Sequence, residues 1–204
     1  MSRRRTVTRV CAWATTLLAA AALPAVGGGP GAASGAHAAA NAERPPLPVR
    51  AAAANTLMLT NVQTGKCLTI AGGVSTDNNV TALQYDCDAH PSRRWRLADV
   101  TGTGQYQVRN VQTGKCLTIA GGVSTDNNVT ALQYDCDAHP SRRWRLADVT
   151  GTGQYQVRNV QTGKCLTIAG GVSTDNNVTA LQYDCDAHPS RRWTLRLAGP
   201  VREG

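Results

Sequence analysis

Four side chains that suit ligand binding stand close together in one short stretch of the sequence: Tyr85, Asp88, His90 and Arg93. A tyrosine ring can pack against the C–H groups of a sugar, while the three polar side chains offer hydrogen-bond donors and acceptors. The arginine guanidinium can also fork to a pair of hydroxyl groups or to a carboxylate. This combination predicts a shallow pocket for a carbohydrate, with Asp77 and Asn79 as outlying candidates.

The set occurs three times, because the 35-residue run from Asn61 to Trp95 is repeated without a change at 110–144 and at 159–193. Repetition with a fixed period of 49 residues indicates an architecture of equivalent units, each with one copy of any site. The predicted sugar-binding residues are therefore Tyr85, Asp88, His90 and Arg93, then Tyr134, Asp137, His139 and Arg142, then Tyr183, Asp186, His188 and Arg191.

The same stretch also contains residue types that could serve metal binding or hydrolysis. Asp86, Asp88 and His90 form a D-x-D-x-H run that could attract a divalent cation, but a turn with ordinary surface acids is the stronger interpretation. Asp88, His90 and Ser92 have the residue types of a hydrolytic triad, yet they crowd one short loop without an indication of an oriented histidine or an oxyanion site. We therefore predict no metal, no cofactor and no catalytic residue.

The first 42 residues have the layout of a secretory signal peptide. Arginines at positions 3, 4, 5 and 9 precede an apolar run from Val10 to Val26, and small residues with two A-x-A sites follow. Pro24 and the Gly-Gly-Gly-Pro sequence after the run disfavour a membrane helix. We predict that residues 1–42 are a secretory signal peptide, 43–54 a Pro/Ala-rich linker, 55–199 the repeat domain and 200–204 a C-terminal tail. The protein would be secreted, with no membrane partner after cleavage.

The net charge gives little reason to expect a nucleic-acid partner. The 204 residues carry a formal charge of +8, and removing residues 1–42 takes away four arginines and no acidic residue, which leaves +4. Much of the basic character therefore belongs to the leader, and we predict no nucleic-acid binding.

Cysteine spacing supports export. Cys11 lies in the leader, and the other six cysteines form three equivalent pairs: Cys67 and Cys87, Cys116 and Cys136, Cys165 and Cys185. An even number at a repeated spacing in an exported chain indicates disulfides, and we predict that each bridge forms within one repeat. A zinc site would need cysteine or histidine ligands at short spacing, which the repeat lacks.

The elements that position these residues are predicted to be strands. In the second copy the expected strands are 106–109, 116–120, 129–136 and 144–149, separated by turns rich in Gly, Asn, Asp and Pro. No window shows apolar residues at helical spacing, so the chain is all-β with twelve strands. Three such units suit a closed barrel with threefold pseudosymmetry, since a propeller needs about four to eight blades. A domain of about 145 residues can stand alone, and we expect a monomer.

Each repeat resembles those of the ricin-type β-trefoil lectin family. It opens with N-x-x-T-G-K-C-L, places a second cysteine 20 residues after the first and just beyond an aromatic residue, and has a tryptophan eight residues later. The resemblance covers about Asn55 to Gly199. It implies a β-trefoil of twelve strands from three 49-residue repeats, a disulfide within each repeat, and carbohydrate binding in shallow pockets, one per repeat at most.

Three positions depart from the pattern of the sugar-binding members. The glutamine of the family's Q-x-W motif is arginine, at Arg93, Arg142 and Arg191. The asparagine before it is serine, at Ser92, Ser141 and Ser190. The aspartate two residues after the first cysteine is threonine, at Thr69, Thr118 and Thr167. The fold signature is thus present, while the galactose-binding polar set is largely replaced.

Two other functions stay open at this point. The arginine cluster Arg93, Arg94 and Arg96 recurs at Arg142, Arg143 and Arg145, and its first two members recur at Arg191 and Arg192. Such clusters could serve electrostatic binding of an anionic polymer. Acidic residues offset it and leave about one net positive charge per repeat. A protein-binding or inhibitory trefoil would instead use loops such as Gly72 to Asn79 and would bind no sugar.

Overall fold

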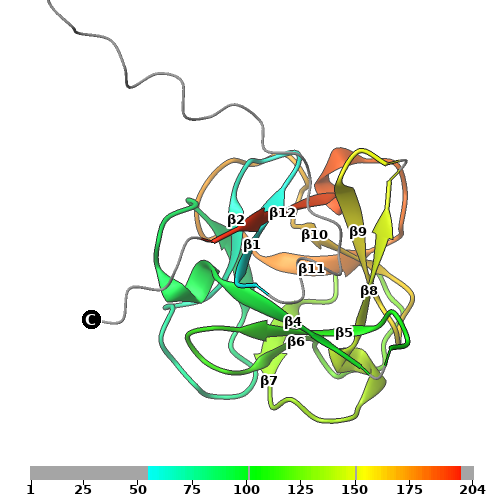
Figure 1. The fold of residues 1–204 in the computed structure, drawn as a ribbon. Helices are drawn as coiled ribbons and strands as arrows, with labels where there is room; N and C mark the ends of the chain where they lie inside the picture. Colours follow the sequence, from blue (N-terminus) through cyan, green and yellow to red (C-terminus); the bar gives the residue numbers. More distant parts are fainter. Residues whose placement is uncertain (1–54, 101, 150, 199–204) are drawn as a thin grey trace, which may run out of the picture. The chain divides into compact units, whose positions relative to one another are not determined.

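The computed structural model describes residues 55–100, 102–149 and 151–198, and they form twelve strands and three short 3-10 helices (Figure 1). The elements are β1 (Leu57–Asn61), β2 (Cys67–Ile70), β3 (Ala82–Tyr85), η1 (Pro91–Arg93), β4 (Trp95–Asp99), β5 (Tyr106–Asn110), β6 (Cys116–Ile119), β7 (Ala131–Tyr134), η2 (Pro140–Arg142), β8 (Trp144–Asp148), β9 (Gln154–Asn159), β10 (Cys165–Ile168), β11 (Ala180–Tyr183), η3 (Pro189–Arg191) and β12 (Trp193–Leu197).

The predicted all-β class with twelve strands is confirmed, although the third strand of each repeat is shorter than predicted. The alternation in 129–136 suggested a strand up to the second cysteine, but β7 ends at Tyr134, where the chain turns toward the disulfide. The predicted leader, linker and tail lie outside the described residues. Within the described residues, no helix has the length and apolarity needed to cross a membrane.

Six strands close into a barrel. The last strand of each repeat pairs with the first strand of the next, in the hairpins β4–β5 and β8–β9, and β12 returns to pair with β1. Short pairings of β1 with β4 and β5 with β8, one residue pair each, and of β9 with β12, two residue pairs, join these strand pairs into a ring. The two ends of the repeat array thus meet in one antiparallel strand pair, where both strands depart in sequence from the repeat.

The remaining hairpins, β2–β3, β6–β7 and β10–β11, cover one end of the barrel. Isolated bridges link them in a cycle: Thr81 with Leu132, Thr130 with Leu181, and Leu83 with Thr179. A six-stranded barrel with three capping hairpins is the β-trefoil that the resemblance implied.

The barrel interior is filled by alternating apolar residues and by Trp95, Trp144 and Trp193, which are 0% exposed. Each indole N–H donates to a carbonyl oxygen of a capping hairpin at 2.9 Å, from Leu68, Leu117 or Leu166. A buried tryptophan contributes a large apolar area but needs a partner for its N–H. These bonds therefore tie the capping hairpins to the barrel in the same way three times.

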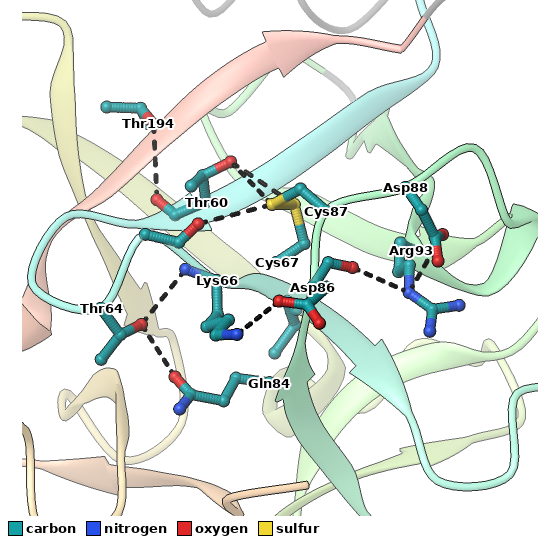
Figure 2. Close-up of a disulfide and its surroundings, with 12 residues drawn as sticks. Thr60, Thr64, Lys66, Cys67, Gln84, Asp86, Cys87, Asp88, Arg93 and Thr194 are labelled. Carbon is teal, nitrogen blue, oxygen red and sulfur yellow. Dashed lines mark hydrogen bonds and ion pairs between the residues drawn. A yellow bond between two sulfur atoms is a disulfide. The ribbon is translucent and has the colours of Figure 1, made fainter. Parts of the chain in front are cut away.

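The predicted disulfides are confirmed, one within each repeat: Cys67–Cys87, Cys116–Cys136 and Cys165–Cys185. Each joins the start of a capping hairpin to the segment just after it, with a Cα–Cα distance of 5.1 Å. Figure 2 shows the Cys67–Cys87 bridge. The bridge fixes the segment that leads from the tyrosine to the histidine and arginine of the predicted site.

Candidate functional site

A pocket with a volume of about 380 Å³ lies on the second repeat. It is lined by Asn79, Thr118, Ile119, Gly121, Gly122, Leu132, Tyr134, His139, Ser141 and Arg142. Three of the four predicted site residues of this repeat, Tyr134, His139 and Arg142, are therefore brought together. The fourth, Asp137, is exposed and does not line the pocket.

The aspartate supports the arginine. Arg142 Nε lies 3.2 Å from Asp137 Oδ1, and the backbone N–H of His139 donates to the same oxygen at 2.9 Å. The other repeats have the same arrangement, with Arg–Asp distances of 3.2 Å for Arg93–Asp88 and 3.3 Å for Arg191–Asp186. The carboxylate thus orients the guanidinium and closes the turn, a positioning role that the residue types alone did not reveal.

The arginine lies over the tyrosine. The guanidinium carbon of Arg142 is 4.4 Å from the centroid of the Tyr134 ring, and the pairs Arg93–Tyr85 and Arg191–Tyr183 have the same separation. This is a cation–π contact, and it occupies one face of the ring. The arginine side chains are only 11–12% exposed. The tyrosine face predicted to receive a sugar is thus partly covered, and the guanidinium itself becomes part of the pocket wall.

A short 3-10 helix sets the position of this arginine. His139 is the N-cap residue of η2, its side chain accepts a hydrogen bond from the backbone N–H of Ser141, and Pro140 occupies the first helical position. Proline suits that position because its fixed φ matches the helix and its missing N–H has no helical partner there. The sequence H-P-S-R therefore fixes serine and arginine locally, and it does so in all three repeats.

The serine and threonine that replace the family's polar residues bind each other in the wall of the pocket. Thr118 and Ser141 are 2% and 0% exposed, and Thr118 Oγ1 donates to Ser141 Oγ at 3.1 Å. His139 Nδ1 lies 2.8 Å from the same serine oxygen and accepts from the serine N–H at 3.2 Å. Because Nδ1 acts as an acceptor, the neutral imidazole carries its proton on Nε2.

The same geometry bears on catalysis. Ser141 and His139 are within hydrogen-bond distance, but the serine is buried, and Asp137 binds the histidine backbone rather than its ring. A nucleophile activated by a histidine that a carboxylate orients is therefore not formed by these three residues. Among the described residues, no group of three or more His, Cys, Asp or Glu is placed to hold a metal ion.

The pocket wall is completed by the preceding repeat. Asn79 belongs to the loop between β2 and β3, has φ 69°, and donates its backbone N–H to Gln133 O at 2.9 Å. Gln133 Nε2 donates in turn to the carbonyl oxygens of Ser75 and Asp77, both at 2.8 Å. The loop of the first repeat is thus fastened to β7 of the second, and Asp77 takes part through its backbone without lining the pocket.

This linkage is cyclic. Asn128 donates to Gln182 O and Asn177 donates to Gln84 O, each at 2.9 Å. The loop of the second repeat is therefore fastened to the third, and the loop of the third to the first. Sequence reasoning placed Asn79 in its own repeat, because a period shows that units are equivalent but not which neighbour a loop contacts. It also missed the Gly121–Gly122 pair on the pocket wall, where Gly122 approaches Ser141 and His139.

Three aspartates beside the sites are held in the charged form. The pKa of Asp135 is lowered by a hydrogen bond from the Asn78 amide and by Lys115. The pKa of Asp86 is lowered by Lys66 and then by Asn176, and that of Asp184 by Asn127 and then by Lys164. Each asparagine comes from the preceding loop of the cycle, so these carboxylates also tie neighbouring repeats together.

Several solved structures share this fold. A designed threefold-symmetric protein, ThreeFoil, is 27% identical with a TM-score of 0.65, over 69% of this chain and 97% of that one. An exo-beta-1,3-galactanase from Clostridium thermocellum is 25% identical with a TM-score of 0.65, over 70% of this chain and 30% of that one. The Rhizoctonia solani agglutinin, at 17% identity and a TM-score of 0.62, covers 70% and 94% and is similar in fold alone.

No curated protein sequence matches the chain. The model of the family described as "Ricin-type beta-trefoil lectin domain-like" matches three times, at residues 49–135, 94–171 and 140–201. These matches span the barrel, the capping hairpins and all three copies of the site. The chain therefore belongs to the ricin-type beta-trefoil lectin domain-like family.

Proposed function

We propose that this protein is a non-catalytic carbohydrate-binding protein that holds a glycan or polysaccharide through up to three equivalent shallow sites. The observation that carries the proposal is the pocket of the second repeat, where Tyr134, His139 and Arg142 meet Asn79 of the neighbouring loop. Membership of a lectin-like family supports the same ligand class.

Each lining group has a distinct part in this proposal. The guanidinium of Arg142, oriented by Asp137, donates to a pair of sugar hydroxyls, and His139 donates from Nε2. The side-chain amide of Asn79 offers both a donor and an acceptor. Sugar C–H groups pack on the exposed part of the Tyr134 ring and on Leu132, which gives the pocket its apolar surface.

A single site of this kind binds weakly, because its polar groups exchange hydrogen bonds with water for hydrogen bonds with sugar at little net gain. A polysaccharide that engages two or three sites at once gains affinity through effective concentration. We therefore propose a preference for polymers or clustered glycans over free monosaccharides.

A glycan-array screen of the protein without residues 1–42, at low and high salt, tests this function. A neutral glycan should be retained with little change in salt. The triple variant Tyr85→Ala, Tyr134→Ala and Tyr183→Ala should lose that retention, while the matched triple Tyr→Phe variant keeps the ring and most of the binding. Equal retention by the parent and the folded alanine variant would remove the tyrosines from the site.

We also propose that residues 1–42 direct export and are then removed, and that 43–54 are a linker. The three disulfides support an oxidising compartment, where such bridges form and persist. The mass of the secreted product after expression of the full chain tests this: an intact leader on the exported protein would contradict it.

One observation favours a second candidate, binding of another protein through the loops. Val74, Val123 and Val172 are the exposed large hydrophobic residues of the described chain, at 63–64%, and each lies in the loop after the second strand of its repeat. A protein partner could cover them. This function predicts no retention on any glycan and a stoichiometric complex that replacement of the three valines by serine abolishes.

A further inference from the structure

Arginines face each other on the outer side of two barrel hairpins. Arg96 of β4 lies directly opposite Arg109 of β5, and Arg145 of β8 lies directly opposite Arg158 of β9. All four side chains are exposed. Residues paired in this way have Cβ atoms about 4.5–5.5 Å apart, and like charges at that separation destabilise the sheet.

No carboxylate relieves this repulsion within the described chain. The ion pairs there involve Lys66, Lys115, Lys164 and the three arginines that lie over the tyrosines, and none involves the four facing arginines. The arginine cluster expected from the sequence is in fact divided. Arg93 is held by Tyr85 and Asp88, Arg94 is 7% exposed, and only Arg96 lies on this outer surface.

One arginine of each pair is already held in place. Arg109 Nε donates to the carbonyl oxygen of Gly114 at 2.7 Å, and Arg158 Nε donates to that of Gly163 at 2.6 Å. The hydrogen bond uses the inner nitrogen of the guanidinium and leaves the two terminal nitrogens as a fork of donors. A positioned fork loses less conformational freedom when an anion binds, which favours binding.

The third strand pair of the barrel, β1–β12, has no facing arginines. At the equivalent register of β1 and β12, Thr60 faces Thr194, and Thr194 Oγ1 donates to Thr60 O at 3.4 Å (Figure 2). The described barrel strands therefore have two arginine pairs rather than three, and the strand pair β1–β12 shows that the same register folds with neutral residues.

We propose that Arg96–Arg109 and Arg145–Arg158 are two anion-binding sites that take carboxylate groups of an acidic polysaccharide. A carboxylate placed between two guanidinium groups accepts bidentate, charge-assisted hydrogen bonds and neutralises the repulsion between them. The sites are separate from the three pockets, and their assignment to a glycan rests on the proposed function.

Continuity with the pocket favours a glycan over a nucleic acid. Gln107 lies two residues before Arg109 on the same outer face, and its Nε2 donates to Asp137 O at 2.7 Å. Asp137 is the residue that orients Arg142 in the pocket. Gln156 makes the same bond to Asp186 O at 2.8 Å on the third repeat. A polymer that fills the pocket can thus follow the hairpin to the arginine pair.

The test compares the parent with the double variant Arg109→Thr with Arg158→Thr, which introduces the residue found at the equivalent Thr60 of β1. The probes are alginate, which is a polyuronate, carboxyl-reduced alginate, and duplex DNA of matched charge. The parent should bind alginate with an affinity that falls as salt rises, because exposed charges are screened. The variant should bind alginate about tenfold more weakly and with a shallower salt dependence, as expected when charge contacts are lost.

The second variant, Arg96→Thr with Arg145→Thr, removes the other arginine of each pair, leaves the hydrogen bonds of Arg109 and Arg158 in place, and should weaken alginate binding in the same way. Equal alginate binding by the parent and both Arg→Thr variants would overturn the proposal, as would failure of the parent to bind alginate. Tighter pair-dependent binding of DNA would overturn the assignment to a polysaccharide. The glycan array on the same variant keeps the two proposals distinguishable, since retention of neutral glycans depends on the pockets alone.

Discussion

The strand pair β1–β12, which closes the barrel, and the hairpins β4–β5 and β8–β9 occupy equivalent places in the barrel but differ in sequence. All three pair a buried tryptophan with a buried asparagine: Trp193 with Asn61, Trp95 with Asn110, and Trp144 with Asn159. On the outer side they diverge, with facing threonines in the first and facing arginines in the other two. The barrel thus requires the inner pairs, whereas the opposite side differs: the four arginines are exposed, while Thr60 is 3% exposed and contacts the sulfurs of the Cys67–Cys87 disulfide.

The shared asparagine explains why the inner pair is the same. Asn61, Asn110 and Asn159 are at most 1% exposed, and each Nδ2 donates at 2.8 Å to the carbonyl of a serine in the repeat before it, with Ser190 preceding Asn61 in the ring. Each Oδ1 accepts from the backbone of the following turn. A buried amide with all partners satisfied specifies one geometry, since any other would leave polar groups unpaired.

The largest expected effect tests the equivalence of the inner positions. The two variants are Trp193→Ala in β12, which closes the barrel, and Trp144→Ala in β8. Each should lower the free energy of unfolding by about 3–5 kcal/mol, because buried apolar area is lost and a cavity is left behind. Both side chains are fully buried and make the same 2.9 Å bond. Denaturant unfolding measures both losses, and values differing by more than about 2 kcal/mol would show that the two buried tryptophan positions are not equivalent.

Removing one disulfide should have a somewhat smaller effect. Two double variants test this: Cys67→Ala with Cys87→Ala, and Cys116→Ala with Cys136→Ala. Each removes a disulfide between cysteines with a sequence separation of 20. The expected loss is about 3 kcal/mol in each case, mainly because the unfolded chain gains freedom. Thermal unfolding checks this, and a loss of stability in only one of the two variants would show that the first two repeats are not equivalent.

Replacing an outer arginine should have a small effect of opposite sign. Arg96→Thr removes one of two facing charges, leaves the hydrogen bond from Arg109 to Gly114 in place, and should raise the free energy of unfolding at low salt by up to about 1 kcal/mol. The gain should shrink at high salt, because the repulsion between exposed guanidinium groups is screened. Unfolding at two salt concentrations measures it, and Ala98→Thr, two residues along on the same exposed face of β4, is the matched neutral control. A gain independent of salt would exclude repulsion as its cause.

The smallest effect concerns pH and the cycle of loops. The pKa values of Asp86, Asp135 and Asp184 lie below the ordinary value of 3.8. Folding therefore favours their charged form, and the resulting stability is present above pH 3.8 and is lost as pH falls through the lowered values. As pH falls through that range, the melting temperature of the triple Asp→Asn variant should decrease less than that of the parent. Equal decreases in melting temperature for the two proteins would contradict this.

The fold was predictable because its determinants repeat in the sequence. The 49-residue period, the cysteines and the tryptophan mark three equivalent β units, and pairs such as Cys116–Cys136 follow from their spacing. Tyr134, His139 and Arg142 could also be grouped, because they are close in sequence and one short helix holds them.

The rest of the site depends on contacts that spacing does not encode. Asn79 reaches the second repeat through a loop whose hydrogen-bond partners lie more than 50 residues away. The stacking of Arg142 on Tyr134, and the displacement of Asp137 from the pocket, follow from side-chain geometry around the turn. Sequence could name these residue types but could not say which of them face the ligand.

The central claim is that each binding site is shared between two successive repeats. Native mass spectrometry can count the molecules of an oligosaccharide identified on the array that bind to each folded chain at saturation. The variants are Tyr134→Ala, Asn79→Gly and their combination, since glycine keeps the positive φ of Asn79 while removing its amide. If both residues serve the same pocket, each variant and the combination should lose the same single bound molecule relative to the parent. Loss of two molecules by the combination would contradict the account, because Asn79 would then belong to a different site.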